Sequence, residues 1–207
     1  MVYGIIIHSS ENETDFHFSY YYNGENEDEY KYIRQQSIIK RVIEENKYYE
    51  EDKGKSENIS KRNTEKYLEL FNIFLSKNAN NEIKMDNEGI FRIVNPSLFK
   101  NKVNIMWKVL NKICYTLIFF THENILLADY FLYNFIFVLR EYYDKLKKFR
   151  KPDMNIFNPD EILAILYYFL PRGQLMLISF NQTKILYNKV KEFLENKAEL
   201  PPKKRIT

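Results

Sequence analysis

The side chains best suited to chemistry in this sequence are three histidines and one cysteine. His8, His17 and His122 could bind a metal or transfer protons, and Cys114 could act as a nucleophile. The histidines lack the spacing of a ligand set, because His8 and His17 fall on two predicted neighbouring strands with no evident third ligand. Cys114 lies in an apolar run, which favours a buried thiol. We therefore expect no metal and no other cofactor.

His122 and Glu123 stand directly before a predicted helix, where they could serve acid–base catalysis. A structural role accounts for them better, because an acidic side chain complements the positive end of a helix and nearby polar side chains satisfy its free amides. The five glycines are scattered singly, so no phosphate-binding loop is present, and no Gly-x-Ser-x-Gly elbow appears. We expect that the chain is not an enzyme.

Length and composition indicate one globular domain. The chain has 207 residues, of which 45% are hydrophobic and 29% charged, enough to bury a sizeable core. Its first residues lack the basic start and the long apolar core of a signal peptide. The richest apolar stretch, residues 125–139, is too short to span a bilayer. We therefore expect a cytoplasmic protein.

Charge is distributed unevenly along the chain. Residues 1–100 carry 14 Lys and Arg against 18 Asp and Glu, whereas residues 101–207 carry 17 against 10. A basic run at residues 145–151 and a second at 203–205 contribute to this excess, which suits an acidic protein or an anionic membrane surface. Binding of nucleic acid would require stacking aromatics or a recognisable motif beside the charge; we find no such motif, and the aromatics crowded on the helix at about 123–148 are more typical of a buried helix.

The hydrophobic pattern predicts two strands, a helix, three strands and then three helices. Residues 2–8 form an apolar run and residues 15–22 alternate, so the two should pair as a hairpin. Asn158, Pro159 and the acids after them are a clear helix start, and Pro171 with Gly173 ends that helix. The other predicted elements are a helix at 26–51, strands at 90–94, 103–110 and 113–120, and helices at about 123–148 and at 182–197.

Two segments fall outside this core pattern. Residues 52–63 are polar and lack apolar anchors, which predicts a flexible loop insertion. Residues 64–77 regain a helical period, with Thr64 as the expected N-cap of an extra helix. We therefore predict a single domain over residues 1–200, followed by a basic tail at 201–207.

Several short motifs in the second half resemble the sigma (small) subunits of adaptor protein complexes. They are Glu-Asn-Ile-Leu-Leu-Ala at 123–128, Ile-Phe-Asn at 156–158 and Phe-Leu-Pro-Arg-Gly at 169–173. The sigma subunit of the fifth adaptor protein complex is the most similar branch. Its resemblance rests on Gly-x-Phe-Arg at 89–92, on Trp107, on His122 before the Glu-Asn pair, and on the Gln-Leu pair that follows Gly173.

The resemblance implies a longin-like α+β fold, an α/β/α sandwich. Its five-stranded antiparallel sheet carries one helix on one face and two or more on the other. It implies a structural subunit of a heterotetrameric, non-clathrin coat that sorts proteins from late endosomes and lysosomes toward the Golgi. The implied partners are large zeta-like and beta-like adaptin chains, a mu chain, and the spatacsin and spastizin proteins. Membrane association would be peripheral, through the complex.

The resemblance also suggests two candidate sites. Sigma subunits help to bind acidic dileucine sorting signals in a groove beside the second helix, and the aligned positions here are Ile136 and Leu146. The connector that follows is longer and more basic than the usual pattern, which puts this groove in doubt. Within the connector, a candidate membrane-facing patch consists of Lys147, Lys148, Arg150 and Lys151.

Two classes of function remain open at this point. As a coat subunit, the chain would pack aromatic surfaces, Trp107 and the tyrosines of the helix at 123–148, against a large partner chain. As a stand-alone longin regulator, it would resemble a trafficking SNARE or a tethering-complex component. A SNARE would need a heptad coiled coil and an anchor after the domain, and the tail after residue 198 is too short for either.

Overall fold

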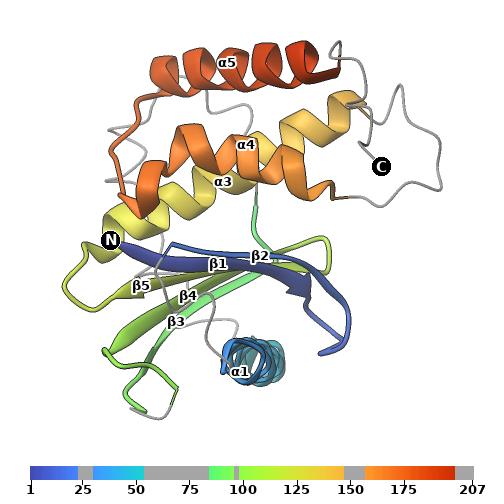
Figure 1. The fold of residues 1–207 in the computed structure, drawn as a ribbon. Helices are drawn as coiled ribbons and strands as arrows, with labels where there is room; N and C mark the ends of the chain where they lie inside the picture. Colours follow the sequence, from blue (N-terminus) through green and yellow to red (C-terminus); the bar gives the residue numbers. More distant parts are fainter. Residues whose placement is uncertain (23–29, 54–83, 96–97, 147–156, 199–207) are drawn as a thin grey trace, which may run out of the picture.

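The structure, a computed structural model, describes residues 1–22, 30–53, 84–95, 98–146 and 157–198. One antiparallel sheet forms the centre of the molecule and helices cover both of its faces (Figure 1). In chain order the elements are β1 (Val2–Ser9), β2 (Phe16–Tyr21), α1 (Lys31–Lys53), β3 (Asn87–Ile93), β4 (Val103–Leu110), β5 (Ile113–Phe120), α3 (Ile125–Leu146), α4 (Pro159–Phe169), the short 3-10 helix η3 (Pro171–Gly173) and α5 (Phe180–Ala198).

The five strands are ordered β2-β1-β5-β4-β3, and every neighbouring pair is antiparallel. The predicted hairpin of β1 and β2 is confirmed, with Ile5 opposite Tyr20. On its other side β1 pairs with β5, where Ile5 lies opposite Leu117. The first strand of the chain is therefore an inner strand of the sheet, and β2 and β3 form the edges.

Each face of the sheet carries its own hydrophobic core. Successive side chains of a strand point to opposite faces, so Ile5 and Leu117 pack toward α3 and α4, whereas Ile6 and Trp107 pack toward α1. In Figure 1, α1 lies below the sheet and α3, α4 and α5 lie above it. For the described residues, the predicted arrangement of one helix on one face and two or more on the other is confirmed.

Most element boundaries agree with the sequence patterns. The bounds of β4 and β5 are those predicted, while β3 begins at Asn87, three residues before the predicted strand. Helix α1 begins at Lys31 instead of residue 26, and α3 spans a slightly shorter range than 123–148. The predicted insertion at 52–63 lies almost wholly outside the described residues, and the extra helix at 64–77 and the tail at 201–207 lie entirely outside them.

The start and end of α4 follow the local chemistry of the sequence. Asn158 is its N-cap, and the side-chain oxygen accepts a hydrogen bond of 3.1 Å from the backbone N–H of Asp160. Gly173 closes the turn after the helix with φ of 73°. A Cβ atom there would lie 2.9 Å from the ring of Tyr22 and 3.0 Å from the carbonyl oxygen of Val2. Only glycine therefore fits where this turn approaches β1.

Helix α5 forms an outer layer. It packs on α4, on the side away from the sheet, and buries Val190 completely (Figure 1). Within the described part of the chain, no helix combines the length and apolar character needed to cross a bilayer.

Candidate interaction surface

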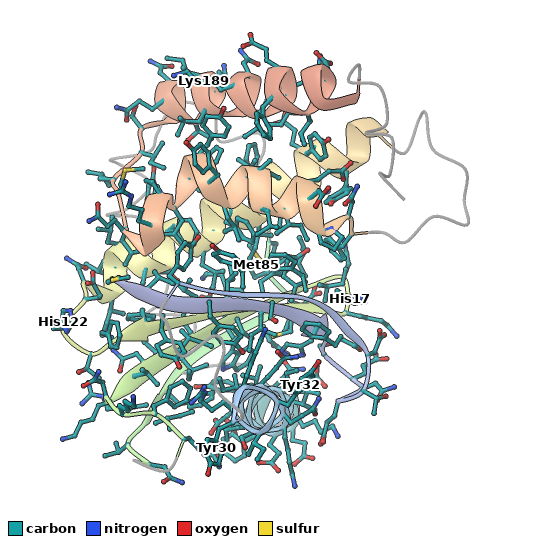
Figure 2. All side chains as sticks on the ribbon, in the orientation of Figure 1. His17, Tyr30, Tyr32, Met85, His122 and Lys189 are labelled. Carbon is teal, nitrogen blue, oxygen red and sulfur yellow. The ribbon has the colours of Figure 1, made fainter. Side chains whose placement is uncertain are left out.

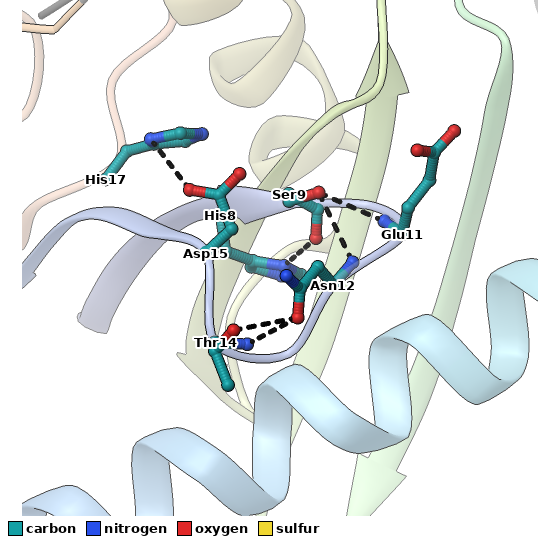
Figure 3. Close-up of polar contacts among 7 residues, drawn as sticks. All are labelled: His8, Ser9, Glu11, Asn12, Thr14, Asp15 and His17. Carbon is teal, nitrogen blue, oxygen red and sulfur yellow. Dashed lines mark hydrogen bonds and ion pairs between the residues drawn. The ribbon is translucent and has the colours of Figure 1, made fainter.

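The histidines of the hairpin hold structural contacts. His8 is fully buried, and its Nε2 atom lies 3.3 Å from the Thr116 hydroxyl while Nδ1 lies 2.7 Å from the carbonyl oxygen of Ser9. Burial lowers the pKa of His8 to about 4, so its imidazole is neutral at pH 7. His17 instead points toward Asp15, with 3.9 Å between Nδ1 and the carboxylate (Figure 3). Among the described residues, no three His, Cys, Asp or Glu side chains are placed to hold a metal ion.

Cys114 is also poorly placed to act as a nucleophile. The thiol is fully buried in the core under α1, 3.6 Å from the Thr116 hydroxyl. Burial raises the pKa of the Cys114 thiol to about 12. A protonated thiol is a poor nucleophile, so the prediction of a buried structural cysteine is confirmed.

The turn that joins β1 and β2 is held by short polar side chains. The hydroxyl of Ser9 accepts hydrogen bonds from the backbone N–H groups of Glu11 and Asn12, at 3.2 and 3.3 Å. The side-chain oxygen of Asn12 in turn accepts from the N–H and the hydroxyl of Thr14 (Figure 3). These contacts complete the backbone hydrogen bonding of an exposed turn.

The polar residues His122, Glu123 and Asn124 directly precede α3. The side chain of Asn124 accepts hydrogen bonds from the backbone N–H groups of Leu126 and Leu127, at 2.9 and 3.2 Å. This cap confirms that polar side chains satisfy the free amides of the helix. Glu123 pairs with the α-amino group of Met1 and lies 3.5 Å from Nε2 of His122. The His122 side chain itself is 73% exposed.

An open cavity lies beside this helix start, where the beginning of β4 lies next to the end of β5. It has a volume of about 380 Å³ and is lined by Asn101, Lys102, Phe120, Thr121 and His122. The ring of His122 stacks on that of Phe120, with 5.7 Å between ring centroids and an angle of 6° between planes. None of the five lining residues is acidic. The cavity therefore offers an ammonium group, an imidazole, an amide and a hydroxyl beside an aromatic wall.

Exposed aliphatic side chains adjoin the cavity along the chain. Ile125 and Leu126, in the first turn of α3, are 46% and 56% exposed. One turn later, the Tyr130 hydroxyl donates a hydrogen bond to the carbonyl oxygen of Ile178, and the preceding Leu177 is 73% exposed. We call Ile125, Leu126 and Leu177, together with Lys102 and His122 of the cavity, the α3-start surface.

The two residues predicted to line a sorting-signal groove lie elsewhere on α3. Ile136 is fully buried in the core between the sheet and the helices above it. Leu146 is the last residue of α3. The basic residues of the connector lie outside the described residues. The sorting-signal groove and the basic patch at Lys147, Lys148, Arg150 and Lys151 therefore stay predictions.

We expected Trp107 and the tyrosines of the predicted helix at 123–148 to form a partner surface, and this expectation is wrong for most of them. Trp107 is fully buried and packs against the ring of Tyr49 on α1. Three of the four tyrosines on α3 are also buried, namely Tyr130, Tyr142 and Tyr143. These side chains are buried because β4 is covered on both faces and α3 packs against both the sheet and α4. Among the described residues, the most exposed aromatic side chains are instead Tyr32, Tyr48 and Tyr167.

One buried charge links three elements. The side chain of Lys108 on β4 is 4% exposed and pairs with Asp129 on α3 at 2.7 Å and with Glu88 on β3. Burial alone would lower the pKa of Lys108, but the charges and hydrogen bonds of the two carboxylates outweigh burial, and the pKa lies above its usual value. Sequence reasoning missed this cluster, because nothing in the local pattern relates the three residues.

Comparison with known proteins places the chain among adaptor subunits. The family model described as AP-5 complex subunit sigma-1 matches residues 1–191. Among solved structures, a chain in a homology model of the full-length AP-3 complex in a stretched open conformation is similar over 96% of each chain, with 14% sequence identity and a TM-score of 0.46. No curated protein sequence matches this chain.

Proposed function

We propose that this chain, which belongs to the AP-5 complex subunit sigma-1 family and is a small subunit of an adaptor protein complex in trafficking, assembles with large zeta-like and beta-like adaptin chains and a mu chain. The family is one of coat subunits, not of enzymes. The observation that carries the proposal is the family match over residues 1–191, which spans every described strand and most of α5.

The proposal extends to the place and direction of transport. A heterotetramer of this kind would form a non-clathrin coat on late endosomes and lysosomes and sort proteins toward the Golgi. Spatacsin and spastizin would be its further partners, and membrane association would be peripheral. The exposed aromatic side chains of α1 and α4, Tyr32, Tyr48 and Tyr167, support a role in partner binding, because such residues are enriched at protein interfaces.

Affinity purification of the chain at its native level, followed by mass spectrometry, tests the proposal. We expect two large adaptin-like chains and a mu-like chain to co-purify, with spatacsin and spastizin as additional components. Recovery of SNAREs or tethering factors in their place would contradict the assembly and favour a stand-alone longin regulator. The matched control is the same purification from cells that express the tag alone.

The two candidate sites from the sequence can be tested on the same preparation. A working sorting-signal groove at Ile136 and Leu146 predicts binding of an acidic dileucine peptide by the assembled complex, lost on Leu146→Ser. A membrane role for the connector predicts that replacing its four basic residues by Glu abolishes liposome binding. Unchanged binding in either experiment would exclude the corresponding site.

A further inference from the structure

The α3-start surface combines two features that do not depend on each other. One is the cavity lined by Lys102 and His122, which has hydrogen-bond donors and no acidic lining residue. The other is the set of three exposed aliphatic side chains, Ile125, Leu126 and Leu177. The backbone amides of Leu126 and Leu127 already donate to the side chain of Asn124, so this surface does not depend on them.

We propose that the α3-start surface is a membrane contact, in which the cavity receives the phosphate of an anionic lipid headgroup and the aliphatic side chains enter the headgroup region. Exposed apolar side chains that enter the headgroup region act together with the attraction of a lysine to anionic lipids. Lys102 supplies the charge, and the Asn101 amide and the Thr121 hydroxyl supply neutral donors. The α-amino group of Met1 pairs with the Glu123 carboxylate, and this positive charge reduces the repulsion between Glu123 and a bound phosphate.

The size of the surface favours a lipid over a protein as its occupant. A stable protein interface buries about 800 Å² on each partner, and three partly exposed aliphatic side chains supply only a small part of such an area. A membrane contact has no comparable requirement, because a few inserted side chains act together with the charge of the bilayer. The aliphatic residues of this surface also differ from the aromatic anchors that dominate protein interfaces.

Flotation of the full chain with vesicles tests the contact. We expect weak binding to phosphatidylcholine vesicles and stronger binding when phosphatidylserine is included, with loss of the difference at high salt. Lys102→Gln should weaken binding to the anionic vesicles about fivefold, since one lysine near the surface contributes on that order. Leu126→Gln should weaken binding to the same vesicles through lost insertion. Soluble glycerophosphoserine should compete poorly if the whole bilayer surface, and not the free phosphate, is the ligand.

Matched control variants exist on α5. Ile185 is 55% exposed, nearly the same as Leu126 at 56%. Lys189 is also exposed and lies on the outer helix, apart from His122 at the helix-start end (Figure 2). Ile185→Gln and Lys189→Gln should leave flotation unchanged, and all four variants should melt at the wild-type temperature.

Three outcomes would overturn the inference. The first is equal binding by the wild type, Lys102→Gln and Leu126→Gln. The second is loss of binding only when the connector at residues 147–151 is reversed in charge. The third is normal flotation of Leu126→Gln together with loss of a co-purifying protein, which would identify a protein interface.

A fluorescent probe gives an independent measurement. In a Cys114→Ser background, Leu126→Cys labelled with an environment-sensitive dye should shift to shorter wavelength on addition of anionic vesicles, whereas labelled Ile185→Cys should not. No shift at position 126 would exclude insertion. The inference rests on the proposed function only in that a coat subunit works at a membrane. Because co-purification tests assembly and flotation tests lipid contact, either can fail without the other.

Discussion

Lys108 on β4 donates a hydrogen bond of 2.7 Å to Asp129 on α3, and this pair joins the sheet to the helix layer above it. The lysine side chain is 4% exposed, whereas Asp129 is 44% exposed. Glu88, on the edge strand β3, pairs with the same ammonium group and is 40% exposed. One buried cation is therefore balanced by two carboxylates that both reach water.

This asymmetry predicts which substitutions destabilise the fold. Removing both carboxylates, by Glu88→Gln with Asp129→Asn, leaves the ammonium group buried without a counter-charge. We expect a loss of about 2–3 kcal/mol in the free energy of unfolding, at or below the usual range for a broken buried pair because water is close. Lys108→Met in the wild-type background should cost less, about 1 kcal/mol, since the carboxylates can hydrate.

Urea unfolding of the single, double and triple variants measures this coupling. Lys108→Met added to the double carboxylate variant should restore most of the lost stability, because it removes the uncompensated charge. If the triple variant is no more stable than the double variant, the ion cluster does not act as a unit.

His8 predicts a pH dependence of stability. The folded protein keeps its imidazole neutral down to about pH 4, whereas the unfolded chain takes up the proton near pH 6.5. The unfolded state therefore binds more protons between these values, so the His8 contribution is fully present above pH 6.5 and is lost as pH falls toward 4. We expect proton uptake by His8 in the unfolded chain to lower the free energy of unfolding by about 2 kcal/mol between pH 7.5 and pH 5. Urea midpoints of the wild type and His8→Gln measure it, and equal slopes in both would contradict the assignment.

Gly89 on β3 lies directly over the indole ring of Trp107. A Cβ atom at this position would come within 2.7 Å of the ring, so we expect Gly89→Ala to cost about 1–3 kcal/mol through overpacking. The same change should cost less in a Trp107→Phe background, where the smaller ring leaves room. Thermal melting followed by circular dichroism provides the four values, and additive effects would show that the two side chains do not interfere.

Cys114 predicts slow thiol chemistry in the native protein. It is the only cysteine in the chain, fully buried, and burial raises the thiol pKa to about 12. We expect a disulfide reagent at pH 8 to react at a rate set by unfolding, and urea to accelerate the reaction in parallel with loss of structure. Cys114→Ser combined with Leu126→Cys is the exposed control and should react at once. Rapid labelling of the native wild type would contradict burial.

The strands of the second half could be predicted because local chemistry defines both ends. Asn111 and Lys112 connect β4 to β5 and both adopt positive φ, 52° and 65°, as a tight two-residue hairpin turn requires. The start of β3 could not be predicted, because Asn87 and Glu88 are polar and become strand only through pairing with Val109 and Lys108. The family match confirms the resemblance drawn from the helix-start and helix-end motifs.

The burial of Trp107 and the cluster around Lys108 depended on contacts between distant parts of the chain. Every residue of β4 is buried, so the strand shows no alternation of exposure that would indicate which face of the sheet carries Trp107 and which carries Lys108. The cavity escaped prediction for a similar reason. It forms because Val103 pairs with Phe120, which brings the residue before β4 next to the residues after β5.

The inner position of β1 has a consequence for biosynthesis. Its partner β5 lies more than 100 residues later, with Ile7 opposite Tyr115. At a translation rate of ~5–20 residues per second, roughly 5–20 s pass before that partner is made. During this interval the emerging chain exposes an apolar strand with one side unpaired, a template for aggregation. The sheet can therefore close around β1 only after more than 100 further residues have been made, because β5 is its second partner.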